Sequence, residues 1–316
     1  MTLISSYAAH MLGRNAALSL VVASVLFAAC GDDTESDGSA GTQADDDGLT
    51  VAASFFPIET VVDSVGGDAI HLVPLVPPGE EAHDYEPTPE QVAALEDADV
   101  VFYLGRDFQP GVQDALDTLP SDVRTVDLLD GVTLLPITDG DGVDPHVWLD
   151  PTNMALMGET VAGVLGELDP AGAAEFTSNA TTFRSDMEAL DGEIAGTLAD
   201  CDARVVVTTH RAFEYLTNRY DLVQLPIAGI SPSEEPSAKT LEAVANAAEE
   251  HGVTTIFFEE NLPDDLARTV ADEIGAEVGV LDPIESPSRD QLDAGETYHS
   301  IMLVNAAALA EGLGCS

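Results

Sequence analysis

Short apolar runs alternate with longer amphipathic stretches along this sequence from about Thr50 onward. Short apolar runs are typical of buried strands, and the longer stretches carry apolar residues at helical spacing. The alternation predicts an α/β protein with parallel sheets flanked by helices. The expected strands are 50–55, 70–76, 100–104, 124–128, 204–209, 223–228, 255–258 and 277–281. The expected helices are 58–65, 88–98, 108–119, 212–219, 238–251, 264–274 and 296–313.

The strand and helix pattern occurs twice, which predicts two similar lobes at 49–168 and 201–316. Residues 169–200 lie between them, and after Pro170 this stretch contains no proline. Its apolar positions recur at spacings of three, four and seven, at Phe176, Phe183, Met187, Leu190, Ile194 and Leu198. This periodicity predicts one long, rigid amphipathic helix of roughly 40 Å that links the lobes. Two helices broken near Gly192 are the alternative.

The N-terminus has the order of charge, apolar run and small residues that is typical of a secretory signal. We expect residues 1–29 to be a signal peptide, followed by a lipidated Cys30, because 25–30 (VLFAAC) resembles a bacterial lipobox with an unusual Phe27. An ordinary signal peptide cleaved nearby is the alternative. Residues 31–48 contain no large apolar side chain, so 30–48 is expected to be an acidic, disordered tether.

The charge balance is extreme, with 58 acidic and 10 basic side chains and a net charge of -48. Such a surface repels nucleic acid and anionic lipid headgroups, so neither is an expected partner through a basic patch. The acidity serves either to concentrate cations or to keep the protein soluble in a salty or acid-selected environment. In an exported protein Cys201 and Cys315 could form a disulfide, although two buried thiols would give the same count.

Three histidines and one aspartate lie where strands or loops end in polar, turn-like sequence. His83 and His146 lie in loops that precede helices, His210 follows the apolar run 205–209, and Asp282 ends the run 278–281. Ligands of open α/β sheets bind beyond the carboxyl ends of the strands, so all four side chains can meet in the cleft between the lobes. Three imidazoles and a carboxylate form a complete shell for a divalent metal, and nitrogen donors favour Zn²⁺ over Mn²⁺.

Four segments carry a resemblance to a known family. They are HDYEPTP (83–89), DPHVWLDP (144–151), GISPSEEPSAKTL (229–241) and IFFEENL (256–262), and the match in order covers about 50–313. The chain resembles the zinc- and manganese-binding solute-binding lipoproteins of ABC importers, the ZnuA/TroA-like family. The resemblance implies His83, His146, His210 and Asp282 as the metal ligands.

The third ligand position distinguishes the metals in this family, and His210 is typical of its zinc-type members. Two departures leave Mn²⁺ open as an alternative. The stretch 138–144 is short and has no histidine, whereas many zinc-type members have a histidine-rich loop there. Ala82 also stands where some zinc-type members have a glutamate, with Glu81 one position earlier.

These observations predict a protein that binds a divalent metal and hands it to an ABC importer permease, without catalysis. It would act as a monomer, held by lipid at Cys30 on the outer face of the cytoplasmic membrane. A zinc-dependent hydrolase with Glu259 as general base is the alternative of a different class, but no H-E-x-x-H, G-x-S-x-G or P-loop pattern is present. Glu259 and Glu260 could equally fix an imidazole tautomer or line an entrance. An adhesive role at the cell surface would add to metal binding.

Overall fold

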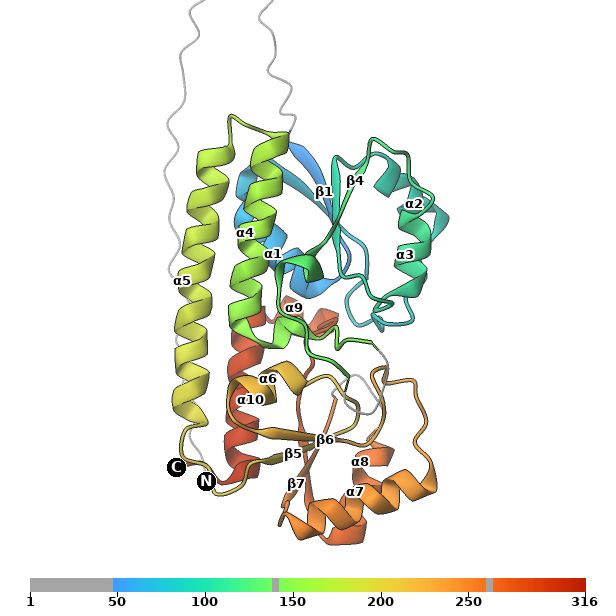
Figure 1. Ribbon diagram of the computed structural model, residues 1–316, viewed down its shortest axis with the longest axis vertical. Helices are drawn as coiled ribbons and strands as arrows, with labels where there is room; N and C mark the ends of the chain where they lie inside the picture. The colour runs from blue at the N-terminus through green and yellow to red at the C-terminus, as the bar shows by residue number, and fades with distance from the viewer. Residues whose placement is uncertain (1–47, 138–141, 260–263) are drawn as a thin grey trace, which may run out of the picture. The chain divides into compact units, whose positions relative to one another are not determined.

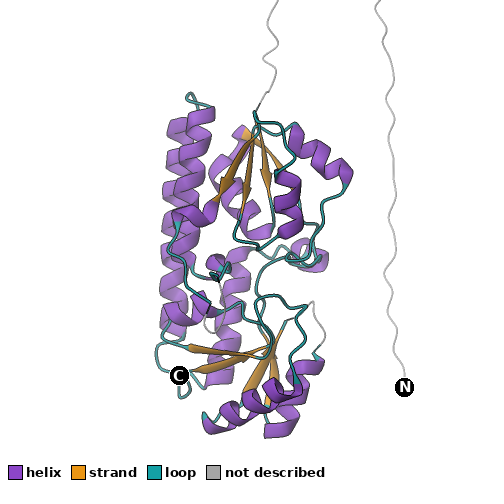
Figure 2. Ribbon diagram, turned by 45° about the vertical axis from the view of Figure 1, so that its right-hand side comes forward, coloured by secondary structure: helices purple, strands orange, loops and turns teal. Residues whose placement is uncertain are grey.

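Two parallel four-stranded sheets form the framework of this protein (Figures 1 and 2). The computed structural model describes residues 48–137, 142–259 and 264–316. The strand orders, β2-β1-β3-β4 and β6-β5-β7-β8, are the same in the two sheets. The prediction of two α/β lobes with parallel sheets is therefore confirmed.

The first lobe is built from residues that precede the long linking helix. Its strands are β1 (Leu49–Ala53), β2 (Ile70–Pro74), β3 (Val100–Tyr103) and β4 (Arg124–Asp127), in a register that pairs Val51 with Val100. Its helices are α1 (Phe56–Gly66), α2 (Pro89–Glu96), α3 (Pro110–Leu116) and α4 (Pro151–Leu168), with short 3₁₀ helices at Gly67–Ala69, Leu128–Gly131 and Val147–Leu149. The bounds of α4 were not among the expected helices, although the loop of His146 was expected to precede a helix.

The second lobe repeats the arrangement. Its strands are β5 (Val205–Thr208), β6 (Val223–Pro226), β7 (Thr255–Phe258) and β8 (Glu277–Val280). Its helices are α6 (Glu214–Arg219), α7 (Ala238–Glu250), α8 (Asp265–Ile274), α9 (Arg289–Asp293) and α10 (Tyr298–Leu313). The central strands β1, β3, β5 and β7 are largely buried, whereas the edge strands are partly exposed. All eight predicted strands lie within two residues of those observed.

The linking helix α5 (Ala173–Thr197) is a single 25-residue helix that is not broken at Gly192. Figure 1 shows it running beside both lobes, in contact with α1, α4 and α10. All six apolar positions predicted to form its inner face are buried. The helix thus contributes its apolar stripe to one continuous hydrophobic core that includes residues of both lobes.

A disulfide joins Cys201 to Cys315 and closes the second lobe at the end of the chain. Backbone hydrogen bonds flank it, from Ala203 N to Leu313 O at 3.1 Å and from Ser316 N to Asp200 O at 3.0 Å. Within the described residues, no helix is both long and apolar enough to span a bilayer. The predicted signal peptide, Cys30 and nearly all of the tether lie outside the described residues.

Candidate metal centre

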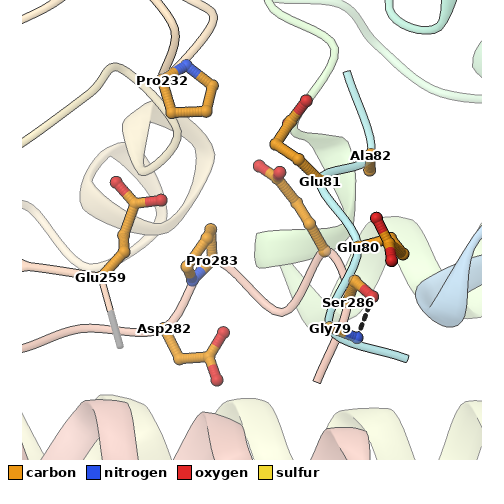
Figure 3. Close-up of a pocket in the computed structure, with 10 residues that line it drawn as sticks. Gly79, Glu80, Glu81, Ala82, Pro232, Glu259, Asp282, Pro283 and Ser286 are labelled. Carbon is orange, nitrogen blue, oxygen red and sulfur yellow. Dashed lines mark hydrogen bonds between the residues drawn. The ribbon is translucent and has the colours of Figure 1, made fainter. Parts of the chain in front are cut away.

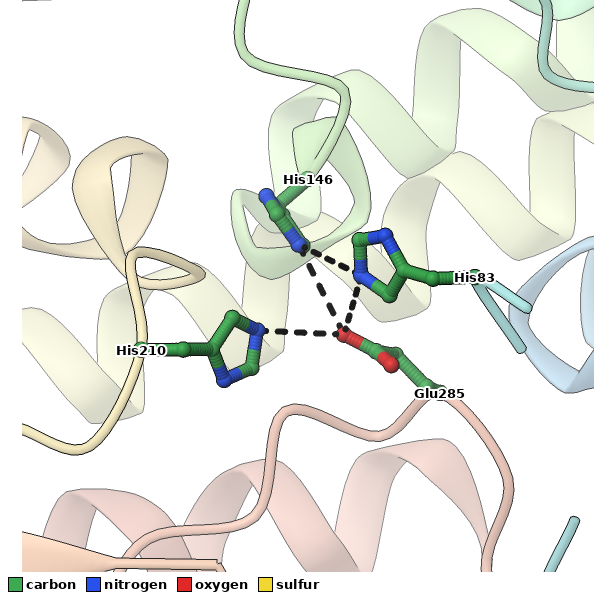
Figure 4. A group of neighbouring side chains, drawn as sticks. All are labelled: His83, His146, His210 and Glu285. Atoms are coloured by element: carbon green, nitrogen blue, oxygen red, sulfur yellow. Dashed lines mark hydrogen bonds and ion pairs between the residues drawn. The ribbon is translucent and has the colours of Figure 1, made fainter. Parts of the chain in front are cut away.

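Four buried side chains from both lobes meet between the sheets. They are His83, His146, His210 and Glu285, and one ligand atom from each lies within 4.8 Å of all the others (Figure 4). Glu285 Oε1 lies 3.4 Å from His83 Nε2 and 3.6 Å from both His146 Nε2 and His210 Nε2. His146 Nε2 lies 3.3 Å from His83 Nε2. Three ring nitrogens and one carboxylate oxygen therefore face a common centre.

His83 is held by the loop between β2 and α2. The Glu81 carboxylate accepts hydrogen bonds from the backbone N–H groups of His83 at 2.8 Å and Asp84 at 2.7 Å. Gln109 donates to the carbonyl of Ala82 at 3.1 Å. The ring of Phe108 packs edge-on against the His83 imidazole with 4.7 Å between centroids. Polar contacts thus fix the backbone of His83, and an aromatic ring limits the movement of its side chain.

His146 follows Pro145 and is oriented by its neighbour Asp144. One oxygen of Asp144 lies 2.7 Å from His146 Nδ1 and also accepts the backbone N–H of His146 at 2.9 Å. Because an ionised carboxylate only accepts hydrogen bonds, Nδ1 carries the proton and the lone pair of the neutral ring lies on Nε2. Tyr215 of the second lobe donates its hydroxyl to the Asp144 carbonyl at 2.9 Å. The Nε2 atom consequently points its lone pair at the common centre.

His210 lies two residues after β5 and is oriented by Glu259, which follows the neighbouring strand β7. His210 Nδ1 lies 2.5 Å from Glu259 Oε1, and the Thr209 hydroxyl donates to the same oxygen at 2.6 Å. The carbonyl of His210 accepts from Thr208 Oγ1 at 2.7 Å and Gln224 Nε2 at 3.0 Å. Glu259 is hydrogen-bonded to the His210 imidazole and also lines the adjoining pocket, the two placements expected for it besides that of a general base. Glu260 lies outside the described residues.

The arrangement of acceptors favours a cation at the centre. Of the four side chains at the centre, His210 and Glu285 each have a buried atom without a hydrogen-bond partner, Nε2 and Oε1 respectively. Burial alone lowers the pKa of His210, but Glu259 and Glu285 outweigh it and raise that pKa to about 10. Burial likewise lowers the pKa of His146, and Asp144 outweighs it, so this pKa is also raised. Without a metal, these shifts therefore favour the protonated form of His210 and of His146.

Glu285 remains ionised despite its burial. Burial raises the pKa of its carboxyl group, but His83, His146 and His210 together bring the pKa well below its ordinary value. A carboxylate with three imidazoles matches the nitrogen and oxygen donor set of a four-coordinate Zn²⁺ site. The residues present thus fit a divalent transition metal as the bound cargo.

The structure brings together three of the four side chains predicted as ligands, His83, His146 and His210, and places Glu285, which was not predicted, beside them. Asp282 is not a member of this cluster, and Glu285, three residues later, supplies the carboxylate. The Asp282 carboxylate instead accepts the backbone N–H of Ile284 at 2.7 Å. The signal that could have revealed Glu285 is a second acidic residue in the turn that follows β8.

An acidic pocket adjoins the cluster on the side of the 79–82 loop. Its lining includes the carboxylates of Glu80, Glu81, Glu259, Asp282 and Glu285 (Figure 3). Pro232 and Pro283 also line it. Negative charge around the opening concentrates cations beside the centre.

Two α/β lobes with a buried polar site between them are typical of solute-binding proteins, which hold their ligand between two lobes. Residues 51–312 match the family described as ZnuA, zinc-uptake complex component A periplasmic, and the chain belongs to this family.

Relatives support this assignment over most of the chain. The zinc-binding lipoprotein AdcA of Streptococcus pneumoniae is 32% identical and aligns with 93% of this chain, which spans only 60% of that relative. The high-affinity zinc uptake system protein ZnuA of Bacillus subtilis is 31% identical, with 92% of this chain and 94% of the relative covered.

Solved structures share the fold. The laminin binding protein Lmb of Streptococcus agalactiae, described as a bifunctional protein with adhesin and metal transporting activity, superposes with a TM-score of 0.77 and 30% identity, covering 84% of this chain and 100% of Lmb. The Zn(II)-bound ZnuA-like domain of Streptococcus pneumoniae AdcA gives a TM-score of 0.74 and 33% identity, covering 84% of this chain and 99% of that domain.

Proposed function

We propose that this chain is the zinc-binding, solute-binding component of an ABC-type zinc uptake system. One observation carries the proposal: three imidazole nitrogens and one carboxylate oxygen, all buried, lie within 4.8 Å of one another. Membership of the ZnuA family and the zinc-bound structure of a relative support the same function. The protein binds its ion and delivers it to a permease without changing it chemically.

The proposed ligands are His83, His146 and His210 through Nε2, and Glu285 through Oε1. Glu285 takes the place that the sequence analysis gave to Asp282. Four protein ligands complete a tetrahedral Zn²⁺ shell, whereas hydrolytic zinc sites have three protein ligands and a water molecule. The cluster therefore favours binding over hydrolysis, including hydrolysis with Glu259 as the base, because Glu259 is hydrogen-bonded to His210.

Zinc is the proposed cargo, with manganese as the alternative. Three nitrogen donors and one oxygen favour Zn²⁺, whereas Mn²⁺ prefers sites richer in oxygen. The test is a competitive titration of metal-stripped protein with Zn²⁺ and Mn²⁺ against a chromophoric chelator. We expect one Zn²⁺ per chain, and His210→Ala should abolish most of the affinity. Unchanged zinc binding by His210→Ala would refute the assigned site.

Membrane anchoring at Cys30 is part of the proposal. Relatives described as lipoproteins support it, as does the lipobox-like sequence before Cys30. The proposed organisation is a signal peptide at 1–29, a tether at 30–48, lobes at 49–168 and 201–316, and a linker at 169–200. The protein would act as a monomer on the outer face of the membrane. Mass spectrometry of the mature N-terminus, compared with Cys30→Ala, tests the lipidation.

Adhesion is a second candidate function, favoured by the similarity to the laminin binding protein Lmb. It would add to metal binding and not replace it. Binding of the purified protein to immobilised laminin, with albumin as the control surface, tests this role. Equal retention on both surfaces would argue against it.

A further inference from the structure

The carboxylate of the metal centre is carried by a turn, Asp282–Ser286, that connects β8 with α9. This turn contains an unusual backbone conformation. Ile284 has a φ of 61°, in the left-handed region, although it is β-branched and fully buried. A branched residue rarely adopts this conformation, because its Cβ crowds the backbone, so neighbouring groups must hold it there. Glu285 follows directly, and its direction depends on this residue.

Asp282 makes the contact that stabilises the turn from within. Its Oδ1 accepts the backbone N–H of Ile284 at 2.7 Å. Its Oδ2 accepts from Gln291 Nε2, on α9, at 3.2 Å. Both carboxylate oxygens are therefore engaged with donors of the segment that surrounds Glu285, and an aspartate that bridges its own backbone in this way favours a tight turn.

Asp282 is itself fixed by α10. Asn305, which is buried, accepts the backbone N–H of Asp282 at 2.9 Å and donates to the Asp282 carbonyl at 2.6 Å. This pair of hydrogen bonds fixes the start of the turn on a helix that packs against α5. The backbone of Asp282 is thus held in place by α10, which fixes the position of its carboxylate.

The first lobe holds the other side of the same turn. Trp148 Nε1 donates to the carbonyl of Pro283 at 2.7 Å. The Ser286 hydroxyl accepts the backbone N–H of Gly79 at 2.9 Å and donates to the carbonyl of Pro77 at 3.0 Å. Glu285 is therefore flanked by two attachments to the first lobe, which also provides His83 and His146.

We infer that Asp282 is the positioning residue for Glu285: it stabilises the left-handed turn at Ile284 that directs Glu285 Oε1 to the three histidines, and does not itself bind the metal. The inference deepens the proposed function and rests on it. It also separates two properties of Asp282. A ligand would need the negative charge of the carboxylate, whereas a positioning residue needs only a hydrogen-bond acceptor for Ile284 N–H.

The experiment compares the same chemical change at the two acidic residues. Asp282→Asn keeps an acceptor and removes the charge, and so does Glu285→Gln. The purified protein is stripped of metal, and zinc affinity is measured by chelator competition. Cobalt absorption spectra report the ligand set independently. Asp293→Asn, at an exposed position at the end of α9, is the matched control.

We expect Asp282→Asn and the control to bind zinc within about threefold of the original protein, with an unchanged cobalt spectrum. Glu285→Gln should weaken binding and alter the spectrum. Asp282→Ala, which removes the acceptor, should weaken binding by roughly 10- to 100-fold, the range seen when residues that orient metal ligands are lost. Circular dichroism checks that Asp282→Ala folds, and the Asn and Gln pair decides the question if it does not.

Two results would overturn the inference. If Asp282→Asn weakens zinc binding as much as Glu285→Gln and alters the cobalt spectrum, Asp282 is a ligand. If folded Asp282→Ala binds zinc like the original protein, Asp282 has no positioning role. Neither result affects the proposed function, provided the original protein and the Asp293→Asn control bind zinc. Failure of the original protein to bind zinc would overturn the proposed function and this inference together.

Discussion

In the proposed site zinc displaces a proton from His210, so the zinc affinity should depend on pH well above the ordinary range of histidine. Glu259 and Glu285, against the opposing effect of burial, raise the pKa of His210 to about 10. At pH 8 the ring of the metal-free protein is therefore almost fully protonated, and the metal needs its Nε2 lone pair. Binding should release about one proton from His210, with a further contribution from His146, whose pKa is also raised.

The magnitude follows from the proton count. One displaced proton changes the apparent dissociation constant about tenfold per pH unit, so between pH 7 and pH 9 affinity should rise at least about a hundredfold. Chelator competition gives the affinity. Calorimetry in buffers of different ionisation enthalpy counts the protons released. Glu259→Gln keeps an acceptor for Nδ1 but loses the charge, so its pH dependence should shift to lower pH, while the exposed Glu249→Gln should behave like the original protein.

The raised pKa of His210 also determines how the stability of the metal-free protein changes with pH. Protonated His210 beside Glu259 stabilises the metal-free fold below the unfolded pKa of about 6.5, and this contribution is lost as pH rises towards about 10. The melting temperature of metal-free protein should therefore fall between pH 7 and pH 10, and that of the zinc-loaded protein should fall less. An affinity that stays constant from pH 7 to pH 9, without proton release at pH 8, would refute the reasoning.

Three further predictions concern the fold. The net charge of -48 opposes compaction because the acidic side chains repel one another, and salt screens this repulsion. Potassium chloride at molar concentration should therefore raise the melting temperature of the metal-free protein more than an isosmotic sugar does. Equal effects of salt and sugar would contradict this prediction. Replacing Cys201 and Cys315 with serine should lower the free energy of unfolding by about 4–5 kcal/mol, because the disulfide restricts the unfolded chain over a separation of 114 residues. Denaturant titration measures this free energy, and a loss under about 1 kcal/mol would contradict the prediction. Leu190→Ala, in the fully buried face of α5, should destabilise the protein by about 2–5 kcal/mol, whereas Thr181→Ala on the exposed face should cost under about 1 kcal/mol.

Sequence pattern was sufficient for the sheets, because the central strands β1, β3, β5 and β7 are short, largely buried apolar runs, and the edge strands keep the same spacing between helices. It was sufficient for α5, whose apolar spacing matches its buried face. It gave no bounds for α4, which is buried on opposite sides: Ala155 and Val164 are both buried although their spacing puts them on opposite sides of the helix. A helix that is buried around much of its circumference lacks a clear apolar and polar division.

The three histidines were predictable, since each ends a polar loop or follows a strand at the carboxyl edge of a sheet. The carboxylate was not, because its position depends on a backbone turn that sequence rules disfavour. Nothing in Ile284 itself indicates a left-handed φ, and the hydrogen bonds that hold the turn come from Asp282, Asn305 and Trp148. Asp282 is the first acidic residue after β8, and a search limited to the end of this strand therefore identifies Asp282 as the ligand. Contacts from distant segments decide that Glu285 reaches the centre.

The two sheets have the same strand order, but the side chains at corresponding positions of the two lobes differ. Since β1 and β5 occupy corresponding places, Phe55, two residues after β1, is the positional twin of His210, two residues after β5. Phe55 packs against Trp148 and Phe108 with ring centroids 4.9 and 5.0 Å apart, and these rings in turn contact His146 and His83. Of these two corresponding positions, one carries a proposed metal ligand and the other an aromatic ring that packs behind the histidines of the first lobe. Two copies of either lobe would not reconstitute the centre, which depends on the divergence of the halves.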